Sequence, residues 1–267
     1  MARSTAAPTH PAAASACAIG GGTGVRRGPP SWPPDIVAGR LAASAVAAAL
    51  SAVAIGGNVA AAREPSVAAV ARCEGARIAV HGGGAADAAS ICAGGRDAFG
   101  FFDERKLDTS IDVDVEVTAV LPDKADAAAL GCYHPARKRV YLLPLAEFAR
   151  RGKWLGLAPE PALYRSLATH EIAHAIVACG LGAAPLSTAS MEYIGYVAML
   201  SSMPADLRRR VLEQQPGSGF DAPAQINTFV YLIDPARFAV QSYRHYQRPE
   251  NGDHFLRDLL SGRILLE

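Results

Sequence analysis

The chain has 267 residues, 50% of them hydrophobic, and its 26 basic and 25 acidic residues leave a formal net charge of +1. This length allows one or two domains with a sizeable buried core. Because there is no excess of positive charge, we expect no nucleic-acid partner.

Residues 41–62 form an uncharged, alanine-rich tract between Arg40 and Arg63. A basic flank, a short apolar core, helix-breaking glycines and a closing Ala-x-Ala at Ala62 are typical of a secretory signal peptide that is cleaved after this residue. The alternative is an uncleaved N-terminal anchor, because this tract of 22 residues is just long enough to span a bilayer. We therefore expect an exported protein, periplasmic or extracellular, that contacts a membrane only if the apolar tract is not removed.

Residues 1–34 are rich in Ala, Pro and Gly and have low complexity, which is typical of disordered segments. The sequence thus divides into a disordered leader plus signal peptide (or anchor) at 1–62 and one mature domain at 63–267. We expect the mature domain to be a monomer.

Five cysteines are present, of which Cys17 lies in the leader. The even number in the mature domain favours two disulfides, and four cysteines allow three pairings. We expect Cys73–Cys92 within the N-terminal part and Cys132–Cys179, which would join a predicted hairpin to the end of a predicted helix. Four buried free thiols are the alternative.

The first part of the mature domain alternates strands and a helix. A short strand is predicted over residues 77–81 and a short helix over residues 85–93, which Gly94-Gly95 ends. Valines alternate with acidic residues over 110–120, which predicts a strand with one buried face. Residues 131–143 predict a hairpin, whose exposed edge could bind an extended peptide by β-augmentation.

The second part is predicted to be mainly helical. A short helix is expected at 145–151, a long one from Pro161 to about Cys179, and another over 189–202, with further helices to the C-terminus. The predicted fold class is therefore α+β: a small strand–helix portion and a short antiparallel sheet, followed by a mainly helical half.

The motif H-E-x-x-H occurs in the long helix, as His170, Glu171 and His174. Residues i and i+4 of a helix share a face, so both imidazoles can bind one ion while Glu171 lies beside it. The flanking residues are apolar, and buried imidazoles are unfavourable unless something binds them. We expect Zn²⁺ here; two core histidines with satisfied hydrogen bonds are the alternative.

A catalytic zinc needs three protein ligands and one open position. A third histidine in the pattern H-E-x-x-H-x-x-G-x-x-H is excluded, because the chain has Val177 and Gly180 at the required positions. Glu192, which follows His174 with seventeen residues between them, is the other solution, on the next predicted helix.

On these residues the chain resembles the gluzincin metallopeptidases, the zincin group that includes thermolysin-like proteases, and small exported bacterial zincin-like proteins of unassigned function. The matching residues are His170, Glu171, His174 and Glu192, within H-E-I-A-H-A and E-Y-I. The resemblance implies that His170, His174 and Glu192 bind zinc and that Glu171 is the general base. It covers these two segments well and the rest of the chain poorly.

The chain also departs from the gluzincin pattern. The spacing to Glu192 is one residue shorter than usual, and no G-A-M-E-N-like aminopeptidase motif occurs upstream. Thermolysin-like members have an aspartate four positions after the glutamate, which orients a ligand histidine, whereas this chain has Tyr196. The partner that orients the histidine is therefore not identified by the sequence.

A peptidase also needs a hydrogen-bond donor for the developing oxyanion. Tyr243, His245 and Tyr246 are of suitable types, and we select His245 and Tyr243 as candidate catalytic residues; a plain helix with surface aromatics is the alternative. The sequence thus predicts an exported zinc peptidase that acts on peptides or proteins. The alternative is a non-catalytic zincin-like protein with a structural zinc and a partner-binding surface.

Overall fold

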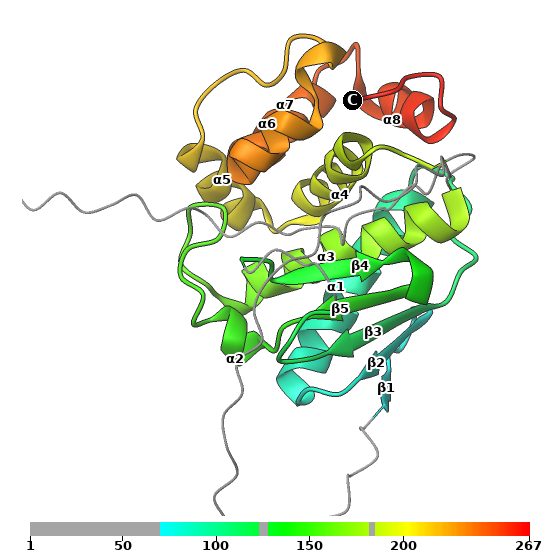
Figure 1. Cartoon of the computed structure of the whole chain (residues 1–267), viewed down its shortest axis with the longest axis vertical. Helices are drawn as coiled ribbons and strands as arrows, with labels where there is room; N and C mark the ends of the chain where they lie inside the picture. The colour runs from blue at the N-terminus through cyan, green and yellow to red at the C-terminus, as the bar shows by residue number, and fades with distance from the viewer. Residues whose placement is uncertain (1–69, 123–127, 182–184) are drawn as a thin grey trace, which may run out of the picture. The chain divides into compact units, whose positions relative to one another are not determined.

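The computed structural model describes residues 70–122, 128–181 and 185–267 (Figure 1). The predicted leader and signal peptide at 1–62 lie outside the described residues. The described part belongs to one compact unit that includes Ala68–Glu267.

The sheet has five strands in the order β1-β2-β3-β5-β4. Their bounds are β1 Val70–Arg72, β2 Ile78–His81, β3 Val113–Val117, β4 Gly131–His134 and β5 Arg139–Leu142. The predicted α+β class and the β4–β5 hairpin are confirmed, but the sheet is not wholly antiparallel: β2–β3 and β3–β5 are parallel pairs. A helix connects β2 to β3, and it supplies the crossover that a parallel pair requires.

Eight α-helices are present in the described residues. They are α1 Ala85–Asp103, α2 Leu145–Phe148, α3 Pro161–Ile176, α4 Thr188–Ser202, α5 Ala205–Gln214, α6 Thr228–Ile233, α7 Pro235–Tyr246 and α8 Gly252–Leu260. Figure 1 shows α4 between α3 and α7, with α1 and α3 beside the sheet. No helix in these ranges has both the length and the apolar character needed to cross a bilayer.

Helix α1 does not end at Gly94-Gly95, as the sequence predicted, but continues through both glycines to Asp103. A Cβ on Gly94 would overlap the carbonyl oxygen of Arg165 and lie 2.9 Å from Ala168 Cβ. A Cβ on Gly95 would overlap the side chain of Ile78. The glycines therefore allow α1 to lie close to α3 and β2, and this packing outweighs their poor helix propensity.

Helix α3 begins at Pro161, as predicted, and one π-helical turn, Val177–Leu181, follows its last α-helical residue Ile176. The α-helix is thus slightly shorter than the predicted range. Proline suits the first helical position because its missing N–H would have no partner there.

The predicted disulfide Cys73–Cys92 is confirmed, and it joins the segment after β1 to α1. The predicted Cys132–Cys179 bridge is wrong, because Cys179 is a free, exposed cysteine. Tyr133 Oη lies 3.1 Å from Cys179 Sγ. Because neighbouring side chains of a strand point to opposite faces, Tyr133 faces Cys179, whereas Cys132 points to the other face, where it lies against Tyr141.

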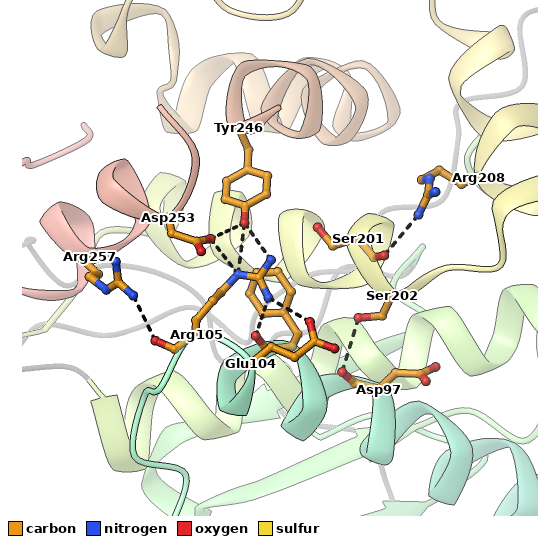
Figure 2. A network of polar contacts seen from close by, with 10 residues as sticks. Asp97, Glu104, Arg105, Ser201, Ser202, Arg208, Tyr246, Asp253 and Arg257 are labelled. Atoms are coloured by element: carbon orange, nitrogen blue, oxygen red, sulfur yellow. Dashed lines mark hydrogen bonds and ion pairs between the residues drawn. The ribbon is translucent and has the colours of Figure 1, made fainter. Parts of the chain in front are cut away.

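Arg105, two residues after the end of α1, connects this helix to α7 and α8 (Figure 2). Its guanidinium carbon lies 3.8 Å from the centre of the Phe101 ring. Its Nε donates to Asp253 Oδ1 at 2.8 Å, and one Nη donates to Tyr246 Oη at 2.8 Å. This contact fixes the C-terminal helices relative to the helices that cover the sheet.

Candidate metal centre

His170 and His174 lie one turn apart on α3, and their side chains converge as the H-E-x-x-H spacing predicts. The ring centroids are 4.4 Å apart, and the two Nε2 atoms are 3.0 Å apart. Both residues are buried, at 0% and 1% exposure. The local helix period therefore brings together two of the three expected ligands.

Glu192 reaches the same point from α4. This helix begins after Ser187, whose side chain accepts a hydrogen bond from the Ser190 amide at 3.1 Å. Glu192 Oε2 lies 3.4 Å from His170 Nε2, and Oε1 lies 3.6 Å from His174 Nε2. The carboxylate is thus placed against both imidazoles.

The three side chains could hold a metal ion, because their ligand atoms all lie within 4.8 Å of one another. Zinc binds such atoms at about 2.0–2.1 Å in a tetrahedron, which sets its ligands about 3.3–3.4 Å apart. The two Nε2 atoms are 3.0 Å apart, and the two closest contacts to Glu192, 3.4 and 3.6 Å, are made to different oxygens of its carboxylate. The three residues can therefore supply ligands to one metal ion.

Both histidines are in the form that binds a metal. Burial lowers the pKa of His170 to about 3, and the backbone of Gly195 acts in the opposite direction. Burial also lowers the pKa of His174 to about 3, with His170 adding to the effect and Glu192 opposing it. Neutral imidazoles have a free lone pair at neutral pH, so they are available as ligands.

Glu171 lies beside the group without being part of it. Its exposure is 0%, and neither carboxylate oxygen has a hydrogen-bond partner among the described residues. Burial and the neighbouring Glu192 raise the pKa of Glu171 well above its usual range, while the nearby backbone amide of Tyr133 acts in the opposite direction. A buried carboxyl with no partner is unfavourable, so its position indicates interaction with something that binds at the centre.

Gly195, on α4, is a functional position that the sequence reasoning missed. A Cβ at this residue would lie 2.8 Å from His174 Cε1 and 2.9 Å from His170 Nδ1. Both rings therefore occupy the space that a side chain would fill. The sequence signal was its spacing of three residues from Glu192, which places both on one face of α4.

Tyr196 occupies the position where thermolysin-like gluzincins have their orienting aspartate. Its ring lies 4.3 Å from the His170 ring at an angle of 46°. The hydroxyl is buried and has no hydrogen-bond partner within the described ranges. Burial, and then Glu192 and Glu171, raise the pKa of this phenol well above its usual range. Tyr196 therefore supports His170 by ring packing.

The predicted oxyanion donors, His245 and Tyr243, contact residues outside the metal-binding group. His245 Nδ1 lies 2.8 Å from Tyr193 Oη, and burial lowers the pKa of His245 to about 4. Tyr243 lies under the guanidinium of Arg208, 6.0 Å from the ring centre. Tyr246, the third suitable residue, contacts Arg105 and Asp253 (Figure 2). The structure thus brings the two histidines and two glutamates together, and it places the residues from α7 against other partners.

No curated protein and no solved structure gives a significant match to this chain. A protein-family model matches residues 78–267, which include the whole candidate centre. The chain therefore belongs to the family described as "Family of unknown function (DUF6639)".

Proposed function

We propose that this protein is a zinc-dependent peptidase with His170, His174 and Glu192 as metal ligands. The observation that carries the proposal is Glu171, a fully buried carboxylate without a hydrogen-bond partner in the described structure, beside a three-ligand group. Two histidines and one glutamate are the ligand set of several catalytic zinc sites, which keep a fourth position open.

The choice of zinc follows from the donor atoms. Two imidazole nitrogens and one carboxylate oxygen suit zinc, whereas magnesium and calcium favour sets made only of oxygen atoms. The two imidazole nitrogens are 3.0 Å apart, close to the ligand spacing of a tetrahedral zinc site. Zinc bound there supplies a Lewis acid that activates a water molecule and polarises a peptide carbonyl.

Glu171 performs the proton transfers in this proposal. Its carboxylate accepts a proton from the attacking water and gives it to the nitrogen of the leaving amine, so the residue ends in its starting state. Within the described residues, no hydrogen bond of good geometry competes for either oxygen, which leaves both available for these transfers. Full burial excludes other water from the reacting atoms.

Strand β4 supports a peptide substrate. It is the terminal strand of the sheet, and a Cβ on its first residue, Gly131, would lie 3.0 Å from Glu171 Cγ. An extended peptide that pairs with this strand would therefore pass beside the general base. This arrangement favours peptides or proteins as substrates.

A structural ion is the second candidate function, and it is favoured by the burial of the centre. The exposures of His170, His174 and Glu192 are 0%, 1% and 0%. A structural site, however, gives no reason for the carboxylate of Glu171, which is not needed to bind the ion. The role of Glu171 therefore distinguishes the two functions.

The test is Glu171→Gln, which keeps the size of the side chain and removes the base. We expect the variant to retain a full equivalent of zinc by metal analysis and to lose at least about 10²-fold in cleavage of a peptide library. Glu213→Gln, on α5 with a side chain that is 59% exposed, is the control and should keep both properties. If zinc-loaded wild type cleaves no peptide, or if the Glu171 variant cleaves equally well, the peptidase proposal fails.

We also propose that the protein is exported. The apolar tract at 41–62 resembles a signal peptide, and the disulfide Cys73–Cys92 suits an oxidising compartment. N-terminal sequencing of the protein recovered outside the cytoplasm tests this, and we expect the mature chain to begin at Arg63.

A further inference from the structure

Tyr196 is placed next to the metal ligands by two elements at once. It follows Glu192 by four residues on α4, so both side chains project from the same helix face. Its ring lies 4.3 Å from that of His170, on α3. Because helical side chains lean toward the N-terminus of their helix, Tyr196 covers the turn that carries Glu192.

The hydroxyl of Tyr196 differs from those of other buried tyrosines. Tyr164 Oη donates to the carbonyl oxygen of Leu143 at 2.8 Å. Tyr193 Oη lies 2.8 Å from His245 Nδ1. Tyr196 is as buried as these, at 0% exposure, yet its hydroxyl has no partner in the part of the chain that the structure describes. A buried hydroxyl without a partner is unfavourable and indicates a ligand that supplies one.

The surroundings of this hydroxyl identify where that ligand binds. The charged groups that raise its pKa are Glu192, then Glu171, and more weakly Asp234 at the start of α7. The first two are one of the metal ligands and the proposed general base. Because the ring also packs against the ligand His170, a hydrogen-bond acceptor that binds at the metal-binding group can satisfy the hydroxyl of Tyr196.

We propose that Tyr196 is a catalytic residue of this centre, whose hydroxyl donates a hydrogen bond to the oxygen of the scissile carbonyl. The inference rests on the proposed peptidase function. As the attacking water adds to the carbonyl carbon, the C=O π pair moves onto this oxygen, and the hydrogen bond strengthens as negative charge develops. The phenol keeps its proton throughout, because Glu171 carries the proton from the water to the leaving amine. Tyr196 thus has the role for which the sequence suggested His245 or Tyr243.

The test is Tyr196→Phe, which removes the hydroxyl and keeps the ring against His170. We expect unchanged zinc content and a fall in kcat of about 10²-fold, with KM little changed, because the hydrogen bond is stronger in the transition state. Tyr193→Phe is the matched control: it removes a hydroxyl from an equally buried tyrosine of the same helix, and it should keep the wild-type kcat.

A second measurement does not depend on hydrolysis. Acetohydroxamate carries an anionic oxygen, and its binding to the Co²⁺-substituted protein can be followed by visible absorption. We expect the Tyr196 variant to bind it about tenfold more weakly than wild type does, and the Tyr193 variant to bind it equally well.

The outcomes separate the two proposals. If wild type shows zinc-dependent hydrolysis and Tyr196→Phe keeps its full kcat and acetohydroxamate affinity, the role of Tyr196 is overturned and the peptidase stands. If Tyr196→Phe loses its metal, the residue is structural and the inference is also overturned. If wild type binds acetohydroxamate but hydrolyses no peptide, the proposed peptidase fails instead.

Discussion

Gly195 lies against His170 so closely that a single methyl group between them would displace the ring. A Cβ on Gly195 would lie 2.9 Å from both Nδ1 and Cε1 of His170. Helix α4 therefore supplies Glu192 and, through Gly195, also leaves the space that the rings of His170 and His174 occupy beside this glutamate. The geometry of the centre depends on this close approach of α4 to α3.

We expect Gly195→Ala to weaken zinc binding by about 10- to 100-fold, the range typical of residues that orient metal ligands. The added methyl group would push His170 and His174 out of position. This effect opposes the intrinsic preference of helices for alanine, so helix propensity cannot explain a loss. The measurement is the zinc dissociation constant, determined by competition with a chromogenic chelator.

Gly100→Ala is the matched control for this variant. Gly100 lies within α1, and a Cβ there would meet no atom within 4 Å. We expect unchanged zinc affinity and a gain in stability of about 0.5–1 kcal/mol, because alanine reduces the entropy of the unfolded chain. Equal zinc affinity of Gly195→Ala and wild type would show that the rings do not need this space.

Glu192→Ala should remove most of the bound zinc, because two imidazoles alone rarely hold the ion. We expect a metal content well below one equivalent after gel filtration, measured by mass spectrometry. Asp114→Ala is the control, since Asp114 also pairs with a histidine, His81, at 2.7 Å but on β3. Full zinc content in the Glu192 variant would mean that the third ligand is another residue.

Parts of the fold that follow from local periodicity could be predicted from the sequence. The start of α3 at Pro161 and the buried face of β3 depend on residues next to each other in the chain. The parallel pairing of β3 with β5 could not be predicted, because it depends on how segments distant in sequence pack. Gly94-Gly95 was misread for the same reason: only the presence of α3 shows that the glycines serve helix packing.

Some residues of the candidate site could likewise be predicted from the sequence, and others could not. His170 and His174 follow from helical spacing alone, and Glu192 from its type and its place on the next helix. Spacing places Gly195 and Tyr196 on the same face of α4 as Glu192, but their contacts with the histidines depend on the distance between α3 and α4, which the sequence does not give. The predicted pairing of Cys132 with Cys179 is wrong because strand alternation points Tyr133, and not Cys132, toward Cys179.

Gly94→Ala tests the close contact between α1 and α3. The new methyl group would overlap the carbonyl oxygen of Arg165 and approach Ala168, so the helices must separate. We expect a loss of about 1–3 kcal/mol in the free energy of unfolding, measured with urea. Separation would also stretch the hydrogen bond from Thr169 Oγ1 to the Gly94 carbonyl oxygen, now 3.1 Å. A variant as stable as Gly100→Ala, on the same helix, would contradict this account of the packing.

His245 should make stability depend on pH. Burial and Arg248 lower its pKa to about 4, whereas the unfolded chain has the ordinary value of about 6.5. Between these two pH values the unfolded state binds a proton on His245 and the folded state does not. The free energy of unfolding is therefore highest above pH 6.5, and it falls as the pH is lowered toward 4. The loss is at most about 3 kcal/mol.

We expect urea unfolding of chelator-treated His245→Gln to depend less on pH between 7 and 4.5 than that of wild type. His254→Gln, whose side chain is 79% exposed, should follow wild type, and an unchanged slope for the His245 variant would assign the pH dependence to other groups.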